Sequence, residues 1–227
     1  RVYEWISPDP VTGLPRGRFE PKQRIITPKK QQMLTMASRY KISKTGTVRA
    51  ELGVSTLDRN TFSREDSGDD NGLSAFVEFK ERLQRDTASN WSFEPSLVYE
   101  FKGRNFTPVN PYRPAEFQRD WNIDPLVKTD EHYFSAGMTT KHRTLGSAMY
   151  QIGGFIQQDN YQGLIHRYDL ATTYKGLALK IYGSELRAES AQQKTSFSRP
   201  RIDINQLLHK NSGLKIGFYG ERERNET

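Results

Sequence analysis

The sequence predicts an all-β fold, an antiparallel up-and-down meander that forms a curved sheet or part of a β-barrel. Three observations support this prediction. Apolar and polar residues alternate along many segments, the links between those segments are short and polar, and helical periodicity is weak throughout. Alternation puts apolar side chains on one face of each strand. Short links require antiparallel neighbours, because a parallel crossover takes a dozen or more residues.

The first 30 residues form a segment rich in proline and glycine. It has no sustained hydrophobic period, so we expect an irregular arm over residues 1–30. The prolines and glycines of this arm are Pro8, Pro10, Gly13, Pro15, Gly17, Pro21 and Pro28.

Residues 31–102 are predicted to be the first antiparallel β segment. Its clearest strands cover residues 45–56, 73–83 and 90–102, where apolar residues fall on alternate positions. In the last of these, one side carries Trp91, Phe93, Leu97, Tyr99 and Phe101.

Residues 103–129 contain four prolines and are too proline-rich for a central strand. We expect either a long structured excursion from the sheet or the seam between two smaller sheets. Within it, residues 114–121 are predicted to form one short helical turn, with proline at its start.

Residues 130–222 are predicted to be the second antiparallel β segment, and residues 223–227 a polar tail. The expected strands cover 133–142, 145–157, 164–174, 177–188 and 213–222. Glycine recurs inside or beside these strands, which indicates bulges, bends and a strongly curved sheet.

The composition, net charge and absence of cysteine exclude several classes of function. Hydrophobic residues make up only 34% of the chain, yet 11% is aromatic, which suits a sheet with one buried and one wet face. The net charge is +7, but basic and acidic residues alternate without a basic run, so no nucleic-acid partner is expected. The chain has no cysteine, and hence no disulfide, no thiolate nucleophile and no cysteine-bound zinc.

The chain carries none of the catalytic motifs sought. A nucleophile elbow, a phosphate-binding glycine loop and a dinucleotide-binding glycine motif are all missing. Paired acids lie in polar loops, where nothing indicates the burial that would raise a carboxyl pKa. The sequence therefore predicts a protein that is not an enzyme.

The loop over residues 57–72 is a candidate calcium site. Asp66, Asp69 and Asp70 offer carboxylate oxygens close together, and neighbouring glycines let the chain fold around a hard cation. The spacing of an EF-hand is missing. The preferred interpretation is a solvated hairpin tip built from ordinary turn residues, with no cofactor.

The excursion also contains a candidate ligand platform. Tyr112 and Trp121 offer aromatic surfaces, while Arg113 and Arg119 offer bidentate donors. The preferred interpretation is structural: Trp121 docks the excursion onto the sheet, and Arg119 pairs with Glu116 or Asp120.

Two stretches resemble a known group of proteins. Residues 53–79 contain Gly-Val-Ser-Thr-Leu-Asp-Arg-Asn-Thr-Phe-Ser and Asp-Asp-Asn-Gly-Leu-Ser-Ala-Phe-Val-Glu-Phe, and residues 112–122 read Tyr-Arg-Pro-Ala-Glu-Phe-Gln-Arg-Asp-Trp-Asn. Both resemble segments of large, mostly uncharacterised β-strand-rich cell-envelope proteins of Bacteroidota. The resemblance implies an outer-membrane or cell-surface location. It also implies partners in the outer membrane, other envelope proteins and the remainder of a longer parent chain, of which this chain would be a fragment.

The sequence thus favours a non-enzymatic structural or transport segment of an outer-membrane β-barrel-type envelope protein. The strands reach the ~9–11 residues that a membrane crossing needs. Polar residues interrupt some of them, as Ser135 and Thr139 do on the Tyr133 face and Arg167 and Asp169 do later, which predicts that some strands lie outside the bilayer. The alternative is a soluble surface or periplasmic β-sheet module that binds a glycan or another polymer.

Overall fold

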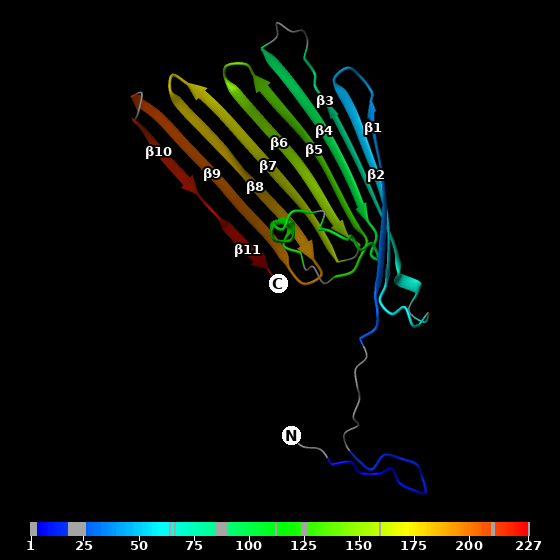
Figure 1. The fold of residues 1–227 in the computed structure, drawn as a ribbon. Helices are drawn as coiled ribbons and strands as arrows, with labels where there is room; N and C mark the ends of the chain where they lie inside the picture. Colours follow the sequence, from blue (N-terminus) through cyan, green and yellow to red (C-terminus); the bar gives the residue numbers. More distant parts are fainter. Residues whose placement is uncertain are drawn as a thin grey trace.

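The computed structural model describes residues 4–17, 26–63, 65, 67–84, 90–111, 113–123, 127–158, 160–209 and 212–226. Within these residues the chain forms one antiparallel sheet of 11 strands and two short helical segments. The sheet is not closed. Figure 1 shows the strands running side by side, with the α1 helix in front of the sheet near one end of the strands.

The strands follow one another in sequence order. Each of the first nine pairs with the next, while β11 pairs with β9. Their bounds are β1 (Lys30–Lys41), β2 (Gly46–Asp58), β3 (Asn71–Glu81), β4 (Trp91–Lys102), β5 (Glu131–His142), β6 (Gly146–Gln157), β7 (Tyr161–Tyr174), β8 (Leu177–Ser190), β9 (Lys194–His209), β10 (Ser212–Tyr219) and β11 (Arg222–Glu226). The helical segments are η1 (Ser67–Asp69) and α1 (Phe117–Trp121). The predicted up-and-down meander is confirmed.

Tight turns join several of the strands. Lys175 and Gly176 connect β7 to β8 with φ angles of 46° and 82°. Positive φ at both central residues is the property of a type I′ turn, whose twist matches the twist of the flanking strands. This link fixes β7 and β8 as a hairpin with Tyr174 directly opposite Leu177.

The pairing register gives the sheet two distinct faces. Residues directly opposite each other on neighbouring strands share a face. One such row runs through Val77, Tyr99, Phe134, Gly154 and Leu164. We call the face that carries this row the apolar face. Its large exposed residues include Leu34, Met36, Tyr40, Leu52, Val54, Leu73, Val77, Trp91, Phe93, Leu97, Tyr99, Phe134, Met138, Tyr150, Ile156, Leu164, Leu170, Tyr174, Leu177, Leu214, Ile216 and Phe218.

The opposite side, here called the polar face, is rich in charged and hydroxyl side chains. Its charged residues include Arg49, Glu51, Glu78, Lys80, Glu94, Glu100, Lys102, Glu131, Lys141, Arg167, Asp169, Lys180, Arg199, Arg201 and Asp203. The excursion between β4 and β5 lies against this face. The hydrophobic core lies between the excursion and the polar face, at the end of the strands where the excursion begins.

Two prolines lie inside strands, at positions where a pairing ends. Pro95 in β4 lies next to Ser96, where the pairing of β4 with β3 stops. Pro200 in β9 lies between the part of β9 that pairs with β10 and the part that pairs with β11. A proline has no backbone N–H to donate, so these junctions tolerate it.

The structure decides between the two expectations for residues 103–129, and it differs from the expected polar tail. The pairing of β4 with β5 runs from Trp91↔His142 to Lys102↔Glu131, so the excursion leaves and rejoins one continuous sheet and is not a seam between two sheets. Residues 222–226, expected to belong mostly to a polar tail, form β11 instead. Of the arm, residues 4–17 contain no helix or strand, and β1 begins at Lys30.

Candidate functional site

The excursion is fixed to the polar face at three places. The first is Phe106, which is 5% exposed and packs against the backbone of β2 and β3. A Cβ atom at Gly72 would lie 2.2 Å from the Phe106 backbone, so only glycine admits this approach. The backbone N–H of Thr107 donates to Ser55 Oγ at 2.9 Å, and Ser55 is 1% exposed. The start of the excursion is therefore bound tightly to β2 and β3.

The second place is a group of ion pairs around Arg113, with Lys102 beside it. The Arg113 guanidinium donates to Glu100 of β4, with Nε 2.8 Å from Oε1, and to Glu131 of β5. Lys102 Nζ lies 3.0 Å from Glu131 Oε1. The side chains of Arg113, Glu100 and Glu131 are 15%, 16% and 7% exposed. Two cations and two anions thus balance one another in a partly buried environment.

The guanidinium of Arg113 also has aromatic neighbours. Its central carbon lies 4.4 Å from the centroid of the Phe117 ring and 5.2 Å from that of Phe155. A planar guanidinium that both stacks on rings and pairs with carboxylates is well suited to such a partly buried position. Arg113 therefore holds α1 and the sheet together.

The third place is the aromatic core under α1. Trp121 and Phe155 are fully buried, with ring centroids 5.5 Å apart, and the Tyr161 hydroxyl donates to the backbone carbonyl of Trp121. Further buried members of the cluster are Ile165, Leu186, Ala188 and Phe197. Trp121 Nε1 has no hydrogen-bond partner among the described residues. Burial of the ring, rather than hydrogen bonding of the indole, therefore stabilises this contact.

The end of α1 continues this attachment. Asn122 follows Trp121 in the left-handed conformation, with φ of 51°, and its side-chain amide donates to Thr195 Oγ1 of β9 at 3.0 Å. Asp120 of α1 accepts a hydrogen bond from Arg199 of β9 at 3.3 Å. An αL residue of this kind ends a helix, and asparagine tolerates the conformation.

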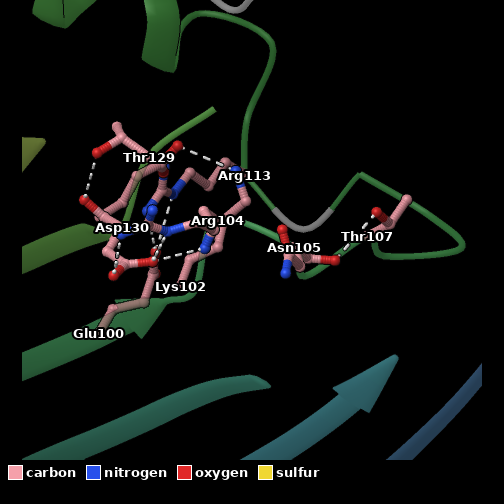
Figure 2. Close-up of polar contacts among 9 residues, drawn as sticks. Glu100, Lys102, Arg104, Asn105, Thr107, Arg113, Thr129 and Asp130 are labelled. Atoms are coloured by element: carbon pink, nitrogen blue, oxygen red, sulfur yellow. Dashed lines mark hydrogen bonds and ion pairs between the residues drawn. The ribbon is translucent and has the colours of Figure 1, made fainter. Parts of the chain in front are cut away.

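A separate pair closes the base of the excursion. The backbone N–H of Arg104 donates to Asp130 Oδ1 at 2.8 Å, and the Arg104 guanidinium reaches Asp130 Oδ2 at 3.3 Å and Gln158 at 3.1 Å. These hydrogen bonds hold the pKa of Asp130 below its ordinary value, with the Arg104 side chain as the main cause. Figure 2 shows Arg104, Asp130 and Arg113 gathered at this base, with Asn105 and Thr107 farther along the segment that leaves it.

These contacts place the candidate ligand residues. Arg113 and Trp121 are used in packing against the sheet, and Trp121 is the anchor that the sequence predicts. Arg119 is exposed, and its ion pair is with the adjacent Asp120 at 3.2 Å, as expected. The main cationic anchor is therefore Arg113 and not Arg119. Tyr112 lies outside the described residues.

The candidate calcium ligands are only partly described. Asp69 lies in η1 and is 3.8 Å from the ammonium of Lys128, and both side chains are more than half exposed. Asp70 accepts a hydrogen bond at its backbone carbonyl from Leu57. Asp66 lies outside the described residues. In the described part of the chain, no group of three or more acidic, histidine or cysteine side chains has the arrangement of a metal site.

A hollow of about 400 Å³ remains on the polar face beside the excursion. It lies between β1–β4 and residues 106–110, and Arg49, Glu51, Phe76 and Glu100 contribute to its lining. Arg49 pairs with Glu51 and lies 5.6 Å from the Phe76 ring centroid. Charged and aromatic groups around such a hollow can bind a polar ligand.

The apolar face has the opposite character. Between the strand ends of β2 to β7 the described residues of this face include no Asp, Glu, Lys or Arg. Two of its histidines are hydrogen-bonded to tyrosines, His132 to Tyr99 at 2.9 Å and His166 to Tyr150 at 2.6 Å. The third, His142 at the end of β5, accepts a hydrogen bond from the backbone N–H of Leu145 at 3.1 Å. The face therefore presents a broad band of side chains that water does not solvate well.

The register also changes the interpretation of the polar interruptions. Ser135 and Thr139 point to the polar face, while Phe134 and Met138 of the same strand point to the apolar face. Arg167 and Asp169 of β7 also lie on the polar face. These residues do not break the apolar band, so they give no reason to place their strands outside a bilayer. The alternation within the strand alone assigns Tyr133 to the apolar side, which is wrong, because Tyr133 lies opposite Glu100 on the polar face.

Comparison with protein-family models, with curated proteins and with solved structures gave no match. Among the described residues, no helix is long and apolar enough to span a membrane.

Proposed function

We propose that this chain forms part of the wall of an outer-membrane β-barrel-type envelope protein, with a structural or transport role and no catalytic one. The observation that carries the proposal is the exposed apolar face, which extends without a charged side chain between the strand ends of β2 to β7 among the described residues. Soluble monomers rarely expose a contiguous apolar surface of this extent. A lipid bilayer would solvate it.

The dimensions of the band fit a bilayer. On β4 the apolar face runs from Trp91 to Phe101, which spans about 34 Å along a strand that rises ~3.4 Å per residue. At the tilt of ~40° common in membrane barrels, this corresponds to a height of roughly 26 Å, close to the ~25 Å apolar band of such proteins.

Aromatic residues lie at the end of the band that carries the β1–β2 and β7–β8 turns, opposite the end where the excursion lies. Tyr40, Trp91 and Tyr174 all belong to the apolar face next to the turns at this end of the strands, and each is more than 40% exposed. Tyrosine and tryptophan are enriched at the two membrane interfaces, where an apolar ring meets a polar environment. Their position supports an orientation in which the apolar face contacts lipid and the strand ends lie at the membrane interface.

The polar face would then line the interior. Its charges are paired with one another, as Glu94 is with Lys141 at 2.8 Å and Asp169 with Lys180 at 3.4 Å. The excursion fills one end of the polar face. Among the described residues, the end of this face near the β7–β8 turn is uncovered. Such an interior suits a polar lumen with a partial plug. Closure of the wall would need strands beyond the two open edges at β1 and β10.

The alternative is a soluble surface or periplasmic module that binds a glycan or another polymer, and the polar hollow beside the excursion favours it. Expression of the full chain with and without detergent separates the two functions. For a barrel wall, we expect recovery of folded protein only in detergent and flotation with phosphatidylcholine vesicles. A monodisperse, folded monomer in detergent-free buffer that does not float with vesicles would support the soluble module.

A further inference from the structure

A second hollow, of about 600 Å³, lies on the apolar face at the excursion end of the strands. On one side it is lined by Phe134, Ile156 and Leu164, which belong to the apolar band. On the other side β8, β9 and β11 contribute basic and acidic residues. The hollow therefore lies on the boundary between the apolar band and a charged rim.

The register explains why there is space. Leu164, Arg187, Ser196 and Arg224 lie directly opposite one another in a row across β7, β8, β9 and β11. Ser196 is small and exposed, and an arginine lies on either side of it. Two long guanidinium side chains thus flank a hydroxyl over an open floor, an arrangement that suits an anion with several oxygens.

The charges of the hollow are not balanced. Lys194 pairs with Glu189 at 3.2 Å, and Arg224 pairs with Glu226. Arg187 has no ion-pair partner among the described residues. The lining therefore contains three basic and two acidic side chains, and the cation left over is the one next to Leu164.

From this arrangement we infer that the hollow binds the phosphate headgroup of a lipid, with Arg187, Ser196 and Arg224 around the phosphate and an acyl chain against Phe134, Ile156 and Leu164. The inference rests on the proposed function, because it assigns a lipid to a face that the bilayer covers. It commits to a lipid rather than to free phosphate, since the cationic row is continuous with the apolar band. Arginine at this depth can extend its guanidinium toward the interface while its stem stays among acyl chains.

The test uses the full chain in a mild detergent, with native mass spectrometry to count bound lipids. Phosphatidic acid is the probe, and phosphatidylcholine, with its zwitterionic headgroup, is the comparison. We expect the wild type to retain phosphatidic acid preferentially. Arg187→Gln should weaken this retention about tenfold or more, because a charge-assisted contact to the phosphate is lost.

Two further variants make the result specific. Ser196→Leu fills the floor of the hollow without changing a charge, and it should also abolish the preference. Arg167→Gln removes an arginine from the polar face of the neighbouring β7, and it should retain the wild-type preference. Circular dichroism of each variant confirms that the fold is intact.

Equal retention of phosphatidic acid by the wild type and Arg187→Gln would overturn the inference. So would complete displacement of the lipid by inorganic phosphate, because the acyl chain would then contribute nothing. Flotation with pure phosphatidylcholine vesicles is measured separately and tests only the proposed function. A chain that floats but shows no lipid preference would refute the headgroup site alone.

Discussion

The ring of Phe134 lies over Gly154 on the neighbouring strand, so close that a Cβ atom at Gly154 would fall 2.0 Å from Phe134 Cζ. Covering a strand glycine with a cross-strand aromatic ring is a recognised way to stabilise a curved sheet. Gly154→Ala should force the ring out of place and destabilise the fold by about 1–3 kcal/mol, measured by denaturant unfolding in detergent. Gly68→Ala is the control, because nothing lies within 4 Å of its Cβ position. Equal effects of the two variants would contradict this packing.

Trp121 should be the main apolar anchor of the excursion. Trp121→Ala removes a fully buried ring, and we expect a loss of about 3–5 kcal/mol together with faster proteolysis inside residues 103–129. Trp121→Phe keeps most of the buried area and removes an indole N–H that has no partner among the described residues, so its cost should be clearly smaller. A ligand platform would show the reverse behaviour, with thermal stability unchanged and binding lost.

Arg113 and Arg119 form a matched pair of substitutions on the same excursion. Arg113→Gln leaves Glu100 without its arginine partner and Glu131 with only Lys102 as a cationic partner. Because both carboxylates are largely buried, the substitution should lower the free energy of unfolding by about 3–5 kcal/mol. Arg119→Gln removes an exposed cation and should change the free energy of unfolding by less than about 0.5 kcal/mol. If thermal unfolding ranks the two variants in the opposite order, Arg113 is not the cationic anchor.

The pair of Arg104 and Asp130 predicts a dependence of stability on pH. Folding lowers the pKa of Asp130, so the folded state favours its ionised form. The stabilisation is fully present above the unfolded-state pKa and is lost as the pH falls through the lower, folded-state pKa. A double-mutant cycle of Arg104→Gln and Asp130→Asn should therefore give a coupling energy near neutral pH that vanishes in strong acid. A coupling energy that grows on acidification would reverse the predicted sign.

Much of the sheet was predictable because alternation is a local property. The strands expected over residues 45–56, 73–83 and 90–102 correspond to β2, β3 and β4, and the short turn expected within residues 114–121 corresponds to α1. No separate strand was predicted for β9. Pro200 interrupts it, and its apolar residues Phe197 and Ile202 face opposite sides.

The anchoring contacts depend on distant residues, and this is why the sequence did not assign them. Arg113 meets Glu100 and Glu131 only because β4 and β5 pair across the excursion. The period-2 pattern of a single strand also does not say which neighbour it faces. From the sequence alone, the polar side of β5 could therefore be mistaken for the apolar side, whereas the register assigns Phe134 and Met138 to the apolar face.

The most direct test of the account compares the same substitution on the two faces, at Leu97 of β4 and at Thr139 of β5. Leu97→Arg puts a charge in the middle of the apolar band, and Thr139→Arg puts it on the polar face near Glu94. The measurement is the free energy of insertion of the full chain into phosphatidylcholine vesicles. We expect Leu97→Arg to cost about 2–4 kcal/mol and Thr139→Arg to cost almost nothing. Equal insertion of both variants, or improved folding of Leu97→Arg in detergent-free buffer, would contradict a lipid-facing sheet.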